Sequence, residues 1–464
     1  MRTFKPYDPD QLYLLPPALR DWLPEGHLAL FISDVVDTLD LEPIFDVYEQ
    51  GDGRGQPPYH PAMMVKLLIY GYCMGKPSSR KLERASYEEV GYRVLSAEQH
   101  PDHDSIAEFR KRHLEVLGGL FVQVLRLCQK AGLVKLGHVA LDGTKIKANA
   151  SKHKAMSYER MCAAEQQLEQ EVAALLARAQ AVDTEEDAQY GAGRRGDELP
   201  AELARRESRL AKIREAKAAL EQEARARAAQ AAAAARGKLA ERERAEAATG
   251  QTRGGRSPTV ADPAQARPVP TAQRNFTDPE SRIMKDGATK GFEQAYNAQA
   301  AVDAHAQIIV AVGVTQEATD KHQRVPLVMQ VEANCGALPA QLSADAGYFS
   351  AANVTAPGLA GVDLYVPPDR QKHGAPPAGV SPPPSPDASV SEQMRHKLTT
   401  PEGREIYGRR KTVVEPVFGQ TKEGRGFRRF SFRGLRKVTA EWALICLTHN
   451  LLKLFRAGPC PQVA

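Results

Sequence analysis

The stretch VALDGTKIK at residues 139–147 decides how the rest of the chain is interpreted. Three apolar residues run directly into the carboxylate of Asp142, a pattern typical of a buried strand that ends at an acid. A buried ionised carboxylate costs several kcal/mol unless it is paired, hydrogen-bonded or bound to a metal. Taken alone, the pair Asp142-Gly143 favours a tight hairpin turn instead, so the remaining sequence has to decide between the two.

Composition bounds the class of protein. The chain has 464 residues and 42% hydrophobic residues, which is more than one average domain and enough for a real core. The net charge of +5 does not by itself indicate nucleic acid. The charge is uneven, however, because the window 404–437 holds eleven Lys and Arg but three acids. This basic segment, residues 404–437, is the best candidate for a surface that faces phosphate.

The cysteines and the apolar runs exclude other classes. The six cysteines are scattered and form no Cys-x-x-Cys pair, so we expect reduced thiols and no zinc site. No apolar run is long enough to cross a bilayer, and the N-terminus lacks the apolar region of a secretion signal. We therefore expect no membrane association and a cytoplasmic protein.

Residues 1–135 have a helical pattern. An apolar helix is expected at 61–74 with proline in its first turn, and after a short turn a basic helix starts near Arg80. This is the outline of a helix-turn-helix, although most helix pairs bind nothing, so both interpretations stay open. A capping box from Ser105 to Glu108 predicts the start of a helix that ends near Gly132. We assign 1–135 to an all-α N-terminal DNA-binding domain.

The middle of the chain changes character. Residues 157–248 consist largely of Ala, Glu, Arg, Lys and Gln, and a Gly-rich break at 190–196 predicts two helices that form a hairpin or coiled coil. The Gly-, Pro- and Ser-rich residues 249–274 predict a flexible linker. We treat 155–274 as one long helical insertion with its linker, and 367–390 as a Pro-rich loop.

Outside this insertion, three acids recur in a regular order of elements. The expected elements are a strand at 138–147, strands at 291–302 and 308–314, a helix around 325–331, short strands at 342–348 and 362–366, a helix at 404–423 and an apolar closing helix at 438–455. Asp142 lies on the first strand, Asp345 on the first short strand and Glu415 on the helix at 404–423. This order is the layout of an α/β RNase H-like domain, a mixed sheet flanked by helices, which we assign to 136–455.

Three carboxylates on two strands and one helix can meet at one edge of such a sheet. There they can hold two divalent ions, one that activates the attacking oxygen and one that stabilises the leaving oxygen. Ligands that are all oxygen suit Mg²⁺ or Mn²⁺.

Three motifs carry a resemblance to a known family. They are LDGTK at 141–145, DAGY at 345–348 and YGRRKTVVEPVFGQTK at 407–422. The chain resembles the DDE transposases of bacterial insertion sequences, in particular the subgroup with a helical insertion after the first acid. The third motif resembles that family's Tyr–Arg–Glu–Lys signature. Arg410 stands five residues before Glu415 where the pattern has four, so Arg409 and Arg410 are both candidates for the arginine.

The resemblance implies roles for individual residues. Asp142, Asp345 and Glu415 would be the catalytic metal ligands. Tyr407, Arg409 or Arg410, and Lys422 would contact DNA. The basic segment adds three expected phosphate contacts, Arg428, Arg429 and Arg433. The acids at Asp278, Asp303 and Asp320 are expected to serve as turn or cap residues instead.

The implied function is a transposase that cuts DNA at the ends of an insertion sequence by hydrolysis. It would then join the 3′-hydroxyl to target DNA by transesterification. Its partners would be double-stranded DNA, both element ends and target, and further copies of this chain as a homo-oligomer on DNA. One alternative is a catalytically inactive DNA-binding protein derived from a transposase, and another is a helical scaffold. The presence of all three acids argues against the first, and the strands and the basic segment argue against the second.

Overall fold

The computed structural model describes residues 18–49, 57–190, 201–252, 254–286, 291–369, 383–385 and 387–458. These form two compact units. Unit 1 contains Met1–Lys147 and Tyr296–Ala464, and unit 2 contains Ala148–Ala295. The helical N-terminal region therefore shares one unit with the strands that carry the acids.

The N-terminal part of unit 1 is helical throughout its described residues. A short 3-10 helix (Leu19–Trp22) precedes α1 (Leu28–Val36), α2 (Glu42–Glu49), α3 (Pro61–Cys73), α4 (Ser79–Glu88), α5 (Val90–Leu95) and α6 (His103–Lys130). The helix predicted from Pro61 is confirmed, with proline in its first turn. The predicted cap at Ser105 is wrong, because the carboxylate of Asp102 accepts from the backbone N–H groups of Asp104 and Ser105 and so starts α6 earlier.

Helix α6 shares its core with the last helix of the chain, α13 (Leu435–Arg456). The two helices approach closely at Gly118, where an added Cβ would lie 3.0 Å from the carbonyl oxygen of Ala440. Glycine at this position is therefore a packing requirement. Trp442 of α13 is 1% exposed, and its indole N–H donates to the carbonyl of Gln299 at 2.9 Å. Trp442 therefore belongs to the core.

The central sheet of unit 1 has the strand order β6-β5-β1-β7-β8. Its members are β1 (His138–Lys147), β5 (Phe292–Asp303, of which Tyr296 onward belongs to unit 1), β6 (Ile308–Thr315), β7 (Gln341–Ser343) and β8 (Asp363–Tyr365). β5 and β6 pair antiparallel, whereas β1 with β7 and β7 with β8 pair parallel. The sheet is mixed, as predicted. The alternative of a hairpin turn at Asp142 is wrong, because β1 continues through it to Lys147.

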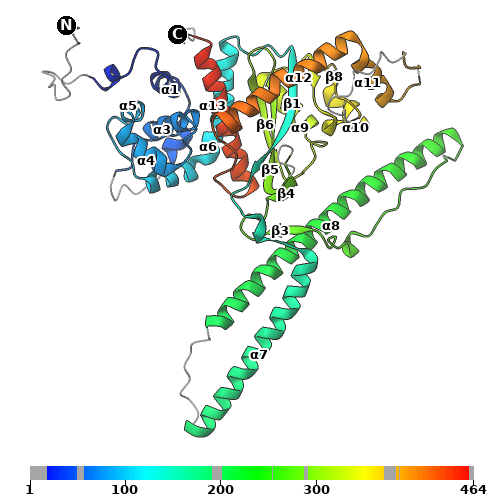
Figure 1. The fold of residues 1–464 in the computed structure, drawn as a ribbon. Coiled ribbons are helices and arrows are strands. Elements are labelled where there is room, and N and C mark those ends of the chain that lie inside the picture. Colours follow the sequence, from blue (N-terminus) through cyan, green and yellow to red (C-terminus); the bar gives the residue numbers. More distant parts are fainter. Residues whose placement is uncertain are drawn as a thin grey trace, which may run out of the picture. The chain divides into compact units, whose positions relative to one another are not determined.

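Helices cover this sheet. α9 (Arg324–Cys335) and α13 pack on β6, and α12 (Pro401–Gly419) packs on β1, β7 and β8 (Figure 1). Smaller elements complete the unit: α10 (Ala351–Val354), α11 (Val390–Thr399), the 3-10 helices Ala346–Tyr348 and Pro357–Leu359, and a π-helical turn at Gln420–Gly424. The predicted order of an acid-bearing strand, two strands, a helix, two short strands and an acid-bearing helix is confirmed.

The strand predicted at 342–348 is shorter than expected. β7 ends at Ser343, and Asp345 instead caps the following 3-10 helix by accepting from the backbone N–H of Gly347 at 2.9 Å. A carboxylate that bonds a backbone N–H two residues ahead forms a turn in place of a strand.

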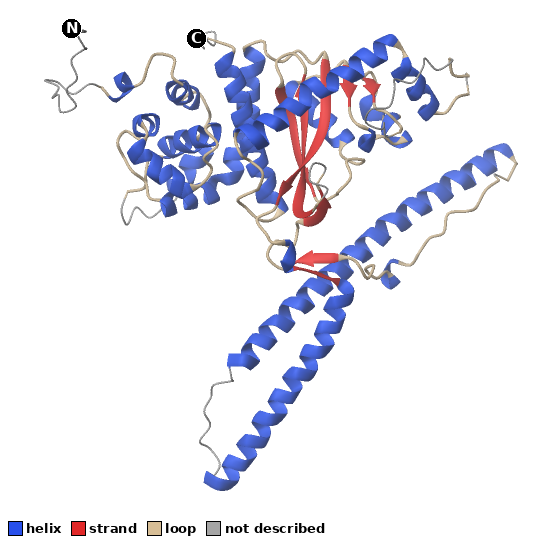
Figure 2. Cartoon of the chain, in the orientation of Figure 1, coloured by secondary structure: helices blue, strands red, loops and turns tan. Residues whose placement is uncertain are grey.

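Unit 2 is built on a helical hairpin. It contains β2 (Ala155–Ser157), β3 (Gln273–Asn275), β4 (Arg282–Lys285), α7 (Tyr158–Tyr190), α8 (Ala201–Thr249) and the 3-10 helices Lys152–Lys154 and Pro263–Gln265. β2 pairs antiparallel with β3, and β4 with the first residues of β5. The two long predicted helices are confirmed (Figure 2), although the residues 191–200 that connect them lie outside the described residues.

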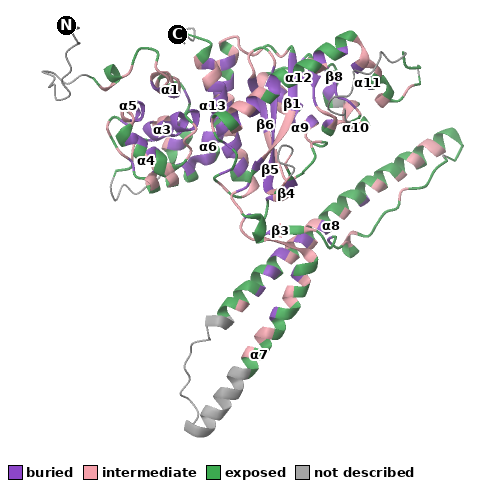
Figure 3. Ribbon diagram, viewed as in Figure 1, coloured by how far each residue is buried: buried purple, intermediate pink, exposed green. Residues whose placement is uncertain are grey.

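A narrow apolar stripe joins α7 to α8. Met161 and Leu168 stand seven residues apart on α7 and pack against Leu210, Ile213 and Leu220 of α8, which is coiled-coil spacing. Over residues 158–177 and 204–249, the remaining faces of the two helices are largely exposed (Figure 3). Charged pairs flank the stripe, as where Glu165 accepts from Lys217 at 2.7 Å and from Arg214 at 3.2 Å. Unit 2 therefore has a core of its own.

Two further expectations concerned the Pro-rich loop and membrane-spanning helices. Most of the predicted Pro-rich loop, residues 370–382 and 386, lies outside the described residues. Among the residues that are described, no helix combines the length and apolar character needed to cross a membrane.

Candidate active site

Asp142 and Asp345 lie at corresponding positions of two neighbouring parallel strands, Asp142 within β1 and Asp345 just after β7. Ala140 pairs with Ser343, and each acid lies two residues beyond its member of that pair. The pKa of Asp142 is raised to about 6. Burial is the largest cause, the guanidinium of Arg410 acts against it, and the negative charge of Asp345 adds to it. The two carboxylates therefore interact between these strands, and the charge of Asp345 disfavours ionisation of Asp142.

Arg410 on α12 is the cation that faces these acids. Its Nη1 donates to Asp142 Oδ2 at 2.9 Å, and its Nη2 lies 4.0 Å from Glu415 Oε1. The Arg410 guanidinium carbon also lies 5.9 Å from the ring centre of Tyr407. Arg410 is buried, whereas Arg409 is exposed and pairs with Glu405. Of the two candidate arginines, Arg410 is the one that contacts the acids.

Glu415 is less enclosed than the two aspartates. Its side chain is 56% exposed, against 20% for Asp142. Within the described ranges, no three acid, histidine or cysteine side chains are arranged as a group that could hold a metal ion. The structure thus brings Asp142 and Asp345 together and joins Glu415 to them through Arg410.

Asp320 is a fourth acid near Asp142 and Asp345, although its sequence context predicted a turn or cap residue. Its Oδ1 accepts from the amide groups of Gln299 at 2.6 Å and Asn297 at 2.7 Å. A Cβ on Gly143 would lie 2.7 Å from Asp320 Oδ1, and one on Gly347 would lie 3.3 Å from Oδ2. Asp320 therefore lies against the glycines that follow the two catalytic candidates.

The sequence did contain a signal for Asp320. It comes five residues after the last residue of β6, Thr315, so it follows a strand, as the other two aspartates were expected to do. Asp303, by contrast, is a cap as predicted: its carboxylate accepts from the backbone N–H groups of Leu136 and His305 at 2.7 and 2.9 Å. Asp278 also lies at a turn, where its carbonyl accepts from the N–H of Ser281.

Lysines complete the surroundings of the acids. Burial lowers the pKa of Lys145 on β1, while Asp320, Asp345 and Asp142 raise it. Lys422, on the π-helical turn, donates to Thr144 Oγ1 at 3.2 Å and to the carbonyl of Lys145 at 3.1 Å. Lys422 is therefore attached to the same strand as Asp142, two residues further along.

The basic segment joins the end of that strand. The N–H of Lys147 donates to the carbonyl of Arg428 at 3.0 Å, and the N–H of Phe430 donates back to Lys147 at 2.9 Å. Arg428 and Arg429 are exposed there, as is Arg433 further along, and Arg428 pairs with Glu423. Cationic side chains thus continue outward from the strand that holds Asp142.

One arginine of the basic segment has a different role. Arg425 donates to Thr448 Oγ1 at 2.7 Å and to Thr421 Oγ1 at 3.1 Å, and burial lowers the pKa of its guanidinium. The expectation that the segment as a whole faces phosphate is wrong for Arg425, because its hydrogen bonds hold the π-helical turn to α13.

Two models of transposase domains match this chain. One, described as Transposase DDE domain, covers residues 384–455, and the other, described as Transposase domain (DUF772), covers residues 17–112. No curated protein and no solved structure matches. The first match contains Glu415, Lys422 and the exposed arginines, and the second contains α1 to α5 and the start of α6. Two separate parts of the chain are therefore similar to domains of transposases, one of them the DDE domain.

Proposed function

We propose that this transposase cuts DNA at the ends of its element by hydrolysis, and joins the 3′-hydroxyl to target DNA by transesterification, at the site around Asp142 of β1. The observation that carries the proposal is the pairing of β1 with β7. It sets Asp142 and Asp345 at equivalent positions, with the pKa of Asp142 raised by burial and by the neighbouring charge of Asp345. Carboxylates crowded in this way are typical of functional sites.

We assign the catalytic domain to the RNase H-like fold. The mixed sheet β6-β5-β1-β7-β8 supports this assignment, together with the helix α12 on its acid-bearing strands and the match to the DDE domain. The domain limits of 1–135 for the N-terminal DNA-binding domain and 136–455 for the catalytic domain remain our proposal. The same holds for the peripheral insertion at 155–274.

Transposases of this class use divalent metal ions, and the donor set fits them. Asp142, Asp345 and Glu415 offer only carboxylate oxygens, the ligands that Mg²⁺ and Mn²⁺ prefer. Arg410 holds positive charge against Asp142 and so favours its ionised form, which is the form that can bind a metal ion. We propose that these three residues hold two ions, which when bound activate the attacking oxygen and stabilise the leaving oxygen.

The neighbouring cations are proposed to bind the DNA strand. Arg410 and Lys422 lie beside Asp142 and Thr144, where a phosphate next to the scissile bond has to enter. Arg409 on α12 and the exposed arginines of the basic segment extend this contact along the backbone. Tyr407, whose ring centre lies 5.9 Å from the guanidinium carbon of Arg410, is proposed to contact the same strand. We further propose that the enzyme acts as a homo-oligomer that holds both element ends.

Conversion of each acid to its amide tests the assignment. Cleavage of end-containing DNA in Mg²⁺ is expected to fall by orders of magnitude for Asp142→Asn, Asp345→Asn and Glu415→Gln, because each change removes an anionic ligand. Glu402→Gln is the matched control, since Glu402 is exposed on the same helix as Glu415. Cleavage by that control should match the parent.

DNA binding separates this proposal from its alternative. Gel-shift affinity for the element ends should survive in all four variants, because the cationic side chains are unchanged. A parent protein that binds the ends but never cuts them with Mg²⁺ or Mn²⁺ would favour the inactive DNA-binding protein instead.

A further inference from the structure

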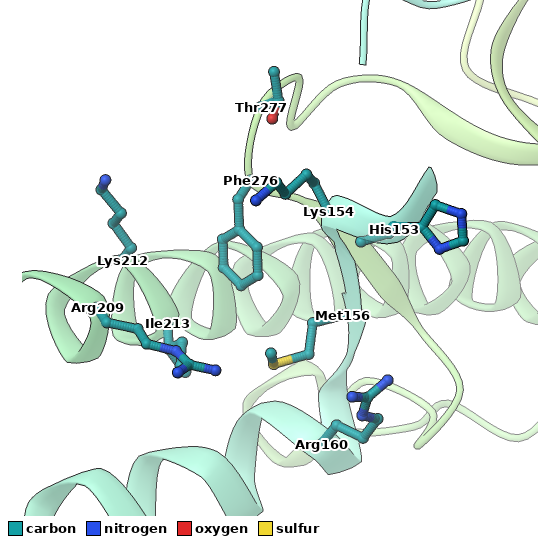
Figure 4. Close-up of a pocket in the computed structure, with 10 residues that line it drawn as sticks. His153, Lys154, Met156, Arg160, Arg209, Lys212, Ile213, Phe276 and Thr277 are labelled. Atoms are coloured by element: carbon teal, nitrogen blue, oxygen red, sulfur yellow. The ribbon is translucent and has the colours of Figure 1, made fainter. Parts of the chain in front are cut away.

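Unit 2 contains a cavity at the base of its helical hairpin. Its volume is about 550 Å³, and it lies between the 3-10 helix Lys152–Lys154, β2, α7 and α8. Figure 4 shows the side chains of Phe276 and Met156 near the middle of this space, with basic side chains around them. Ile213 of the hairpin core lies beside them. The cavity thus has an apolar floor.

The rim of the cavity is cationic. It carries His153, Lys154, Arg160, Arg209 and Lys212, and none of its ten lining residues is an acid. Arg209 and Lys212 stand three residues apart on α8, so they share one helix face. All five basic side chains are exposed. Five basic groups around one opening make a local field that attracts anions.

Charge pairing elsewhere on the hairpin makes this rim distinctive. Arg214 and Lys217 of α8 are paired with Glu165, and Arg274 and Arg282 are paired with Glu223. The five rim groups, by comparison, form no ion pair with any residue in the described part of the chain. Folding of unit 2 therefore does not use their charge.

We propose that this cavity is a second DNA-binding site of the transposase, one that holds the sugar-phosphate backbone. Phosphate oxygens would bind Arg160, Arg209 and Lys212, and the deoxyribose would lie on Phe276 and Met156. The apolar floor fits the deoxyribose of a nucleotide, and the cationic rim fits its phosphate. Several Lys and Arg around one groove are the usual means of sequence-independent DNA contact. The inference rests on the proposed function, because DNA must be the substrate.

The salt dependence of DNA binding tests this site. In the full-length chain, R160Q/R209Q/K212Q should lower the magnitude of the slope of log affinity against log salt by about 2 to 3, since each lost phosphate contact removes about 0.9. The matched control is R225Q/R236Q/K238Q, which removes the same charge from exposed positions of α8 outside the cavity. Its slope should stay close to that of the parent.

Two further measurements keep the outcome decisive. Thermal melting checks that each triple variant folds. If the cavity triple variant does not fold, the single variants R209Q and K212Q replace it, and each should lower the slope by about 0.9. Inorganic phosphate, added alone while melting is followed, tests the other source of the same chemistry. Phosphate that stabilises the parent but not the cavity variant, with no change in the DNA slope, would overturn the proposal in favour of a small-anion site.

The result also distinguishes this inference from the proposed function. An equal slope for the cavity variant and the parent, in a protein that still binds and cuts its DNA, overturns only the second site. A parent that does not bind DNA at all overturns both.

Discussion

At the scale of single residues, Gly143 explains why the sequence around Asp142 resembles a turn. The residue lies inside β1, and it is small because a Cβ would lie 2.3 Å from Gln299 Nε2 and 2.7 Å from Asp320 Oδ1. The Asp-Gly pair thus reflects close approach between β1 and a polar cluster. Sequence alone does not separate these two uses of glycine, since both require the absence of a side chain.

Gly143→Ala is therefore expected to damage the site. The added methyl group should displace Gln299 and Asp320, lower the free energy of unfolding by about 1–3 kcal/mol, and reduce cleavage. Gly119→Ala is the control, because nothing lies within 4 Å of a Cβ at that position of α6, and alanine there should stabilise the helix by up to about 1 kcal/mol. Unfolding in urea measures both, and a neutral Gly143→Ala would contradict the packing argument.

The acids themselves were predictable only in part. Asp142, Asp345 and Glu415 were proposed because each stands in an apolar context or in a family motif. Asp320 was missed because it stands in a polar stretch, where an acid looks like a turn residue. Its position depends on hydrogen bonds from Asn297 and Gln299, which lie 23 and 21 residues before it on β5.

At the scale of elements, apolar periodicity predicted which strands and helices exist but placed their ends less well. β7 ends before Asp345 because a carboxylate captures a backbone N–H, and α6 starts at His103 because Asp102 does the same. Such local bonds compete with regular structure. The π-helical turn after α12 was not expected at all, since its hydrogen bonds through Arg425 depend on α13.

Helix α13 gives the protein a predicted dependence on pH. Burial lowers the pKa of His449 to about 3, and its ring N–H donates to the carbonyl of Gln307 at 2.9 Å. The folded pKa lies below the unfolded value of about 6.5. The stability from neutral His449 is thus fully present above pH 6.5 and is lost as the pH falls toward 3, at up to about 1.4 kcal/mol per pH unit.

Urea unfolding between pH 4 and pH 7 measures this effect. His449→Gln should flatten the decline in stability on acidification, because no buried imidazole remains to be charged. His322→Gln is the control, since the His322 side chain is 69% exposed, and it should follow the parent. If the His449 variant keeps the slope of the parent, then His449 is not the group responsible.

At the scale of the whole molecule, the helical insertion has its own core, and its first and last residues lie on one pair of strands, β2 and β3. Ser157 of β2 pairs with Gln273 of β3, so the two ends of the insertion are adjacent. Replacing 158–272 with an Asn-Gly turn, which joins antiparallel strands well, should leave unit 1 folded with a cooperative thermal transition. Loss of that transition, followed by calorimetry, would mean that unit 1 depends on the insertion.

The central claim is that Asp142, Asp345 and Glu415 form one metal-binding catalytic site. The most direct test is the melting temperature of the parent and of Asp345→Asn as Mn²⁺ is added. Without metal, the variant should melt at or above the parent, because one of two crowded carboxylates has lost its charge. With metal, the parent should be stabilised by about 2.7 kcal/mol at a hundred times its dissociation constant, and the variant should respond far less. Equal stabilisation of the two proteins by Mn²⁺ would contradict the claim.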